Sequence, residues 1–129
     1  MEERKKVNSD EWLYRRSYCS PEKKYCNPDG TATSRAFKLR ESDNNELSVD
    51  VKSLSGPEIS IKDSTKYFLF EIANKSVEDI GLETFHDPDE TGGNTAHAVI
   101  LGMTMEDEVS PVLLAKKSKR VILNEVPGN

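Results

Sequence analysis

The chain has few of the residues that mark a disulfide scaffold, a metal centre or a phosphate-binding loop. Its 129 residues include two cysteines, two histidines and seven glycines, and two cysteines are too few for a disulfide-rich secreted domain. Cys19 and Cys26 are seven positions apart and have no second pair, so they do not match a zinc knuckle. We expect free thiols, with one disulfide as the alternative, no metal and no cofactor.

Long apolar runs are also absent, and apolar residues make up 35% of the chain. The N-terminal stretch MEERKKVNSDEW is charged and lacks the apolar centre of a secretion signal. No run approaches the length of a membrane span. These absences predict a cytoplasmic protein that does not enter a membrane. The length suits one domain, which we expect over residues 10–129, preceded by a flexible tail over residues 1–9.

The net charge of -5 conceals an uneven distribution along the chain. Residues 1–40 carry ten Lys or Arg against six Asp or Glu, whereas residues 41–110 carry four against sixteen. One interpretation is that these charges lie on different solvated faces, and the other is that an electropositive face attracts an anionic partner. The stretch WLYRRSYCSPEKKY mixes cations with aromatics and could bind nucleic acid, but the acidic middle of the chain would repel phosphate.

Short extended segments separated by turn residues dominate the pattern. Strands are expected at 12–18, 33–40, 66–74, 82–87 and 95–103, and 47–54 fits either a strand or the start of a helix. The two most apolar segments, 66–74 and 95–103, should be neighbouring strands at the centre of the sheet. Ser110 and Pro111 suit the start of a helix that ends near Lys119. The fold class is therefore α+β, mainly an antiparallel sheet with one short C-terminal helix packed on it.

The stretch HDPDETGGNTAHAVI at 86–100 contains both histidines and three acidic residues. It could connect two strands, form half of a polar pocket, or ligate a metal, although flexible turns lack the fixed geometry of a metal site. His97 lies within an apolar strand and His86 at a strand end, so we expect His97 to be the more buried. If a pocket exists, His97 should meet a polar side chain from 15–16 or 48–50.

Four phrases of the sequence resemble a family of small, largely uncharacterised bacterial proteins. They are LYRR, NPDGTATSRAFKL, ELSVD and NTAHAVILG, and together they extend over about 13–102. The C-x6-C insertion departs from the family pattern, so the resemblance implies no role for the cysteines. It implies that one constellation contains these residues: Arg15, Arg16, Ser34, Phe37, Ser48, Asp50, Asn94 and His97.

A second resemblance concerns an arginine on the first strand and a serine on a nearby strand. Such a pair is similar to the dinucleotide pocket of ADP-ribosyltransferase-like folds, where the arginine grips phosphate. A glutamate usually completes that pocket, and this sequence offers His97 instead. The structural alternative is that Arg15 or Arg16 pairs with a carboxylate, for which Asp50 is the candidate.

Two functional hypotheses follow. The first is a bacterial binding or accessory module that acts with a protein partner. The alternative is an ADP-ribosyltransferase-like enzyme or nucleotide-ligand-binding domain. No serine or cysteine lies in a recognisable nucleophile motif, so no catalytic residue is assigned. The candidate pocket comprises Arg15, Arg16, Ser34, Ser48, Asp50, Asn94 and His97. Convergence of these side chains on one concave site would favour the alternative, and scattering would favour the module.

Overall fold

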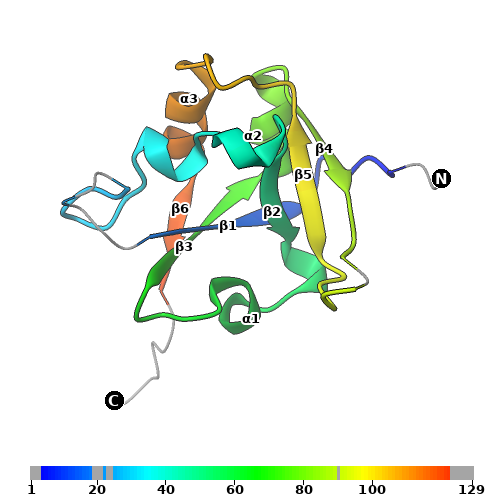
Figure 1. The fold of residues 1–129 in the computed structure, drawn as a ribbon, viewed down its shortest axis with the longest axis horizontal. Helices are drawn as coiled ribbons and strands as arrows, with labels where there is room; N and C mark the ends of the chain where they lie inside the picture. Colours follow the sequence, from blue (N-terminus) through cyan, green and yellow to red (C-terminus); the bar gives the residue numbers. More distant parts are fainter. Residues whose placement is uncertain (1–3, 19–21, 23–24, 90, 123–129) are drawn as a thin grey trace.

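The centre of the computed structural model is a six-stranded antiparallel sheet (Figure 1). The structure describes residues 4–18, 22, 25–89 and 91–122. The strand order is β4-β5-β2-β1-β3-β6. The strands are β1 (Trp12–Tyr18), β2 (Leu47–Val51), β3 (Tyr67–Ala73), β4 (Glu83–His86), β5 (His97–Leu101) and β6 (Lys119–Val121). The expected α+β class with an antiparallel sheet is confirmed.

More helical segments accompany the sheet than the single C-terminal helix that the sequence predicts. They are α1 (Pro57–Ile61), α2 (Asn74–Asp79), α3 (Ser110–Lys117) and the 3-10 turns η1 (Ser34–Phe37), η2 (Glu41–Asp43) and η3 (Lys52–Leu54). The prediction of a strand at 33–40 is wrong. Ala36 and Phe37 are consecutive and both fully buried, which the alternation of a strand with one buried face does not allow. No helix in the described ranges combines the length and apolar character needed to cross a bilayer.

The two faces of the sheet are covered unequally. The main core lies beneath η1, α2 and α3, where Phe37, Val77 and Leu114 meet side chains from the central strands. The opposite face carries α1 and a smaller cluster of Tyr14, Ile61 and Leu69. Figure 1 shows α1 and α3 on opposite sides of the sheet. The C-terminal helix is therefore packed on the sheet as expected, as part of a larger helical layer.

The two most apolar strands are not neighbours, contrary to the prediction. β3 lies between β1 and β6, and β5 lies between β4 and β2. The two central strands are β1 and β2. Both contain polar residues, and for this reason the sequence did not predict their central position. Leu13 on β1 and Leu47 on β2 are fully buried, although β1 also carries Arg15 and Arg16 and β2 alternates apolar residues with Ser48 and Asp50. The prediction of central strands from apolar content failed for β1 and β2, because these two strands carry the polar residues of the candidate site.

β1 and β2 separate after a short contact. They pair only at Leu13 with Val51 and Tyr14 with Asp50. Beyond that point β1 stays with β3 as far as Tyr18, and β2 stays with β5 as far as Leu47. The sheet is thus open between its two central strands, and main-chain groups of β2 in the opening must find partners other than β1.

The described part of the expected N-terminal tail pairs with the sheet edge. Val7 N donates to Thr84 O at 2.8 Å, and His86 N donates to Lys5 O at 2.7 Å. Val7 is buried in the main core. Residues 5–7 therefore lie beside β4 and extend the edge of the sheet.

Helix α3 is capped by a residue other than the one predicted. The sequence suggests Ser110, but the carboxylate of Asp107 accepts hydrogen bonds from Val109 N at 3.0 Å and Ser110 N at 2.9 Å. These contacts, the one with Ser110 first, lower the pKa of Asp107 below its ordinary value of 3.8. An aspartate outside the helix reaches these N–H groups, whereas Ser110 itself is the first helical residue.

Replacing Asp107 with Ala should lower the free energy of unfolding by about 1 kcal/mol at pH 7, a typical loss for a helix cap. The carboxylate is charged in the folded state down to a lower pH than in the unfolded chain. Its contribution is therefore complete above pH 3.8 and is lost as the pH falls below that value. Urea unfolding of both proteins should show a stability difference at pH 7 that shrinks at pH 3, and a constant difference would contradict the cap.

Candidate functional site

Arg15 fills the opening between β1 and β2. Its Nε donates to the main-chain oxygen of Ala36 in η1 at 2.7 Å, and its Nη1 donates to the main-chain oxygen of Ser48 at 2.8 Å. The guanidinium therefore replaces the missing strand pairing by a side-chain bridge. Burial lowers the pKa of Arg15 to about 10, and the negative charge of Asp43 acts in the opposite direction. The fold thus encloses a cation at a cost in solvation.

Arg16 points to the other face of the sheet, as the alternation of a strand requires. Its Nη1 donates to the main-chain oxygen of Ser60 in α1 at 3.3 Å, and its guanidinium lies 4.9 Å from the centre of the Tyr67 ring. Among the described residues, no carboxylate forms an ion pair with Arg15 or Arg16. The prediction that one of them pairs with Asp50 is wrong.

Two hollows meet at this opening and share Arg15, Arg16 and Ser48. The α1 hollow, about 630 Å³, lies on the side of α1 and the 92–95 turn. The η1 hollow, about 660 Å³, lies on the side of η1 and the residues that follow it. Six of the seven predicted pocket residues line the α1 hollow, and the seventh, Ser34, lines the η1 hollow: the six are Arg15, Arg16, Ser48, Asp50, Asn94 and His97. The predicted residues therefore converge on one opening rather than scatter.

Asp50 organises one wall of the α1 hollow. Its carboxylate accepts a hydrogen bond from Ser60 Oγ at 2.7 Å and one from Asn94 Nδ2 at 3.0 Å. Ser60 belongs to α1, and Asn94 belongs to the turn before β5. Asp50 therefore connects both segments to β2. Both oxygens of its carboxylate accept hydrogen bonds from neutral side chains, and neither contacts an arginine.

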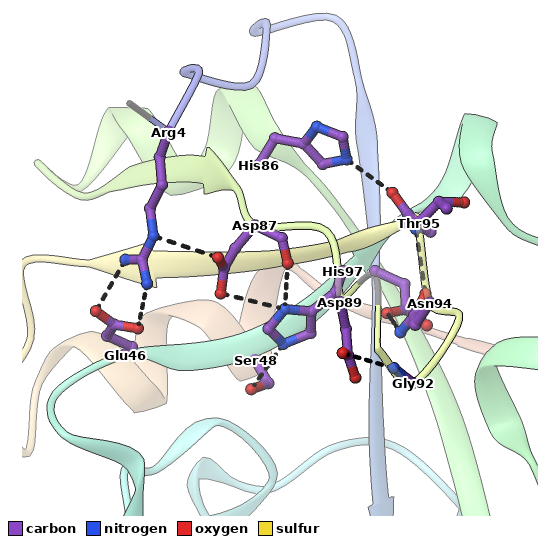
Figure 2. A network of polar contacts seen from close by, with 12 residues as sticks. Arg4, Glu46, Ser48, His86, Asp87, Asp89, Gly92, Asn94, Thr95 and His97 are labelled. Carbon is purple, nitrogen blue, oxygen red and sulfur yellow. Dashed lines mark hydrogen bonds and ion pairs between the residues drawn. The ribbon is translucent and has the colours of Figure 1, made fainter. Parts of the chain in front are cut away.

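His97 contacts Ser48 across the two neighbouring strands β5 and β2 (Figure 2). Its Nε2 lies 3.2 Å from Ser48 Oγ, which is the kind of contact expected from the sequence. Its Nδ1 lies 2.8 Å from the main-chain oxygen of Asp87 and 3.5 Å from the carboxylate of the same residue. The Asp87 carboxylate in turn lies 3.4 Å from Arg4 Nε. His86 makes a single contact in Figure 2, to the main-chain oxygen of Thr95 at 2.8 Å.

The 86–100 stretch is the connection of a β-hairpin and also supplies the α1 hollow. β4 and β5 pair from Glu83 with Leu101 to His86 with Ala98, and the turn is held by Asp89, which accepts from Gly92 N at 2.8 Å. Within the part of the chain that the structure describes, no group of three or more metal-ligating side chains is found. A strand connection and half of a polar pocket thus coexist in this stretch.

The η1 hollow contains cations that the sequence interpretation missed. Besides the two strand arginines, Arg35, Lys38 and Arg40 line it. None of its described lining residues is acidic. The signal was present in SRAFKLR, where three cations fall within six residues, but the expected strand would have placed Arg35 on the face opposite Lys38 and Arg40. The 3-10 turn η1 and the loop after it bring them to one side instead.

Of the two cysteines, Cys26 is buried in the main core beside the turn at Gly30. Cys19 lies outside the described residues, so whether it pairs with Cys26 stays a prediction.

No protein-family model, no curated protein and no solved structure matches the chain.

Proposed function

We propose that this protein binds a small anionic ligand of the nucleotide type in the η1 hollow. The observation that carries the proposal is the set of five cationic side chains that line this hollow, with no acidic side chain among its described lining residues. Arg40 pairs with Asp43 at 3.6 Å. Arg15 contacts only main-chain oxygens and Arg16 a main-chain oxygen and a ring, so an anion would supply the ion-pair partner that these two arginines lack among the described residues.

Aromatic rings beside these cations support a ligand with a planar base. The ring of Tyr18 lies 5.4 Å from that of Tyr25 and 5.3 Å from that of Tyr67, centre to centre. Arg35 lies 5.6 Å from the centre of the Tyr25 ring. Bases stack on aromatic side chains while phosphates bind arginine, and this combination distinguishes a nucleotide from a simple anion.

Four of the seven predicted residues, Arg15, Arg16, Ser34 and Ser48, line the η1 hollow. This favours the hypothesis over the accessory module, for which the described residues offer no specific observation. Whether the ligand is a nicotinamide dinucleotide, as the resemblance to ADP-ribosyltransferase-like folds suggests, stays a prediction. His97 lines the α1 hollow but not the η1 hollow, although Ser48 connects the two. The protein partner, the bacterial origin and the cytoplasmic location also stay predictions.

Calorimetric titration with ADP, ADP-ribose and inorganic phosphate tests the proposal, with a matched pair of lysine variants. Lys38→Met removes a cation from the η1 hollow, whereas Lys75→Met removes one from the exposed surface of α2, where it pairs with Asp79. We expect Lys38→Met to weaken ADP binding about tenfold, the value of one charged hydrogen bond. Lys75→Met should leave it unchanged.

A ring variant separates a nucleotide from a simple anion. Tyr25→Leu should weaken ADP binding about fivefold or more through lost stacking, yet leave phosphate binding unchanged. Absence of ADP binding at millimolar concentration, or an equal loss in the two lysine variants, would overturn the proposal. If phosphate binds as tightly as ADP, the hollow binds a simple anion and does not recognise the base of a nucleotide, which would also overturn the proposal.

A further inference from the structure

Ser48, His97 and Asp87 form a chain of contacts whose order is hydroxyl, imidazole and acid. The Ser48 hydroxyl is exposed on β2 and lies 3.2 Å from His97 Nε2. The other ring nitrogen lies 2.8 Å from the main-chain oxygen of Asp87 and 3.5 Å from its carboxylate. Figure 2 shows the imidazole between the serine and the aspartate. The sequence predicts the contact between His97 and a residue of 48–50, but not the contacts of His97 with Asp87.

The main-chain contact determines which ring nitrogen carries the proton. A carbonyl oxygen can only accept a hydrogen bond, so Nδ1 must carry the hydrogen that it donates to Asp87 O. In the neutral ring Nε2 then has a free lone pair, and the Ser48 hydroxyl is the donor of their hydrogen bond. The ring is therefore held in the tautomer that can accept a proton from a serine nucleophile.

The aspartate is itself held from the far side. Arg4 lies 3.4 Å from the Asp87 carboxylate and donates to both oxygens of Glu46, at 2.9 and 3.1 Å. This clamp comes from the N-terminal segment and from the residue before β2. It orients the acid without contacting Ser48 or His97, so the Ser48 hydroxyl stays open toward the α1 hollow that it lines.

The walls of the α1 hollow suit a substrate that is apolar at one end. Leu54 and Ile59 line it and are 52% and 69% exposed, so apolar surface is available beside the hydroxyl. Arg15 and Arg16 line the same hollow. A positive charge there would stabilise the negative oxygen of a tetrahedral intermediate.

We propose that the protein hydrolyses a small carboxylic ester in the α1 hollow, with Ser48 as the nucleophile and His97 as the general base. Ser48 Oγ forms a bond to the ester carbonyl carbon, and its proton moves to His97 Nε2. The bond from that carbon to the alcohol oxygen breaks, and the leaving alcohol takes the proton from Nε2. Water then attacks the acyl-serine and gives its proton to Nε2, and the carboxylic acid leaves as the proton returns to Ser48.

This inference goes beyond the proposed ligand binding and does not depend on it. The probes are neutral esters, p-nitrophenyl acetate and p-nitrophenyl butyrate, which carry no phosphate. A negative result in ester hydrolysis would leave the calorimetric result intact, and absence of ADP binding would leave the hydrolysis intact.

The first measurement uses the unaltered chain and an alkyl fluorophosphonate, which reacts with activated serine hydroxyls. We expect one label per chain, located at Ser48 by peptide mass analysis. Because this measurement needs no variant, it does not depend on whether an altered chain folds. Labelling at another serine, or none at all, would overturn the proposal.

The second measurement compares ester hydrolysis by Ser48→Ala, His97→Gln and the control Ser53→Ala. Ser53 is an exposed serine of η3 that lines neither hollow. Ser48→Ala and His97→Gln should each lower kcat/KM by about 100-fold or more, while Ser53→Ala keeps the original rate. Equal rates in Ser48→Ala and Ser53→Ala would show that hydrolysis does not use the contact chain.

Discussion

Replacing Phe70 with Ala is expected to lower the free energy of unfolding by about 3 to 5 kcal/mol. Phe70 is fully buried on β3, and its ring centre lies 6.5 Å from that of Phe37 in η1. The residue opposite it on β1 is Arg15, so the ring lies directly beside the opening of the sheet. Removing it creates a cavity that the surrounding strands cannot close. Urea unfolding monitored by far-UV circular dichroism measures the loss.

Phe68→Ala is the matched control on the same strand and the same face. Phe68 is only partly buried, and Arg120 lies 3.7 Å from the centre of its ring. Part of the space left by its ring would be open to solvent, so the cost should be about half that of Phe70→Ala. A loss below about 1 kcal/mol for Phe70→Ala, or equal losses for the two variants, would contradict the burial of Phe70 in the main core.

The strands could be predicted wherever alternation or apolar content was strong. The expected segments 12–18, 66–74, 82–87 and 95–103 contain β1, β3, β4 and β5, and the ambiguous 47–54 begins as β2 and continues as η3. The failure at 33–40 has a local cause. TSRAFKLR alternates loosely enough for a strand, but its two buried residues are adjacent, and only contact with α3 and β3 selects the 3-10 turn.

The order of strands could not be predicted because it depends on contacts between distant segments. β1 lies at the centre although it carries two arginines, since one serves the opening and the other lies against α1. A prediction from apolar content excludes such a strand from the centre. The predicted and the observed strand order therefore differ at the place where β1 and β2 do not pair and a polar site lies between them.

Contacts between distant segments also decide which parts of the site could be predicted and which were missed. His97 and Ser48 were selected as members of a pocket, but their contact depends on the register between β2 and β5, in which Asp50 rather than Ser48 lies opposite His97. A histidine that reaches the serine two residues along is a diagonal neighbour. Asp87 was not among the selected residues, because its contact with the imidazole uses a main-chain oxygen, which every residue type has.

The N-terminal segment links the stability of the fold to the site. It pairs with β4 through Val7, and it carries Arg4 to the carboxylate of Asp87. A buried amide, Asn74, joins this segment to the sheet from inside. Its Nδ2 donates to the main-chain oxygens of Val7 at 3.0 Å and Asn8 at 3.1 Å. Its Oδ1 accepts from the buried hydroxyl of Thr84, so every polar atom of the side chain has a partner.

Replacing Asn74 with Asp should lower the free energy of unfolding by about 3 kcal/mol or more at pH 7. The two side chains have the same shape, so no cavity forms, but the aspartate would turn an oxygen toward two carbonyl oxygens. A charged carboxylate there would be buried without a cation, and a protonated one could donate to only one of the two oxygens. Stability should therefore fall less at pH 4 than at pH 7, because protonation removes the buried charge.

Asn27→Asp serves as the control, since Asn27 is an exposed residue of the turn before η1 and makes contacts of the same type, to Thr31 and Ala32. Its cost should stay within about 1 kcal/mol, because water can replace the lost donors. Amide hydrogen exchange locates the effect: in Asn74→Asp the N–H groups of Val7 and His86, which pair the N-terminal segment with β4, should exchange faster than those of β3. A uniform acceleration across the sheet, or a loss no larger than in Asn27→Asp, would show that Asn74 does not anchor this segment.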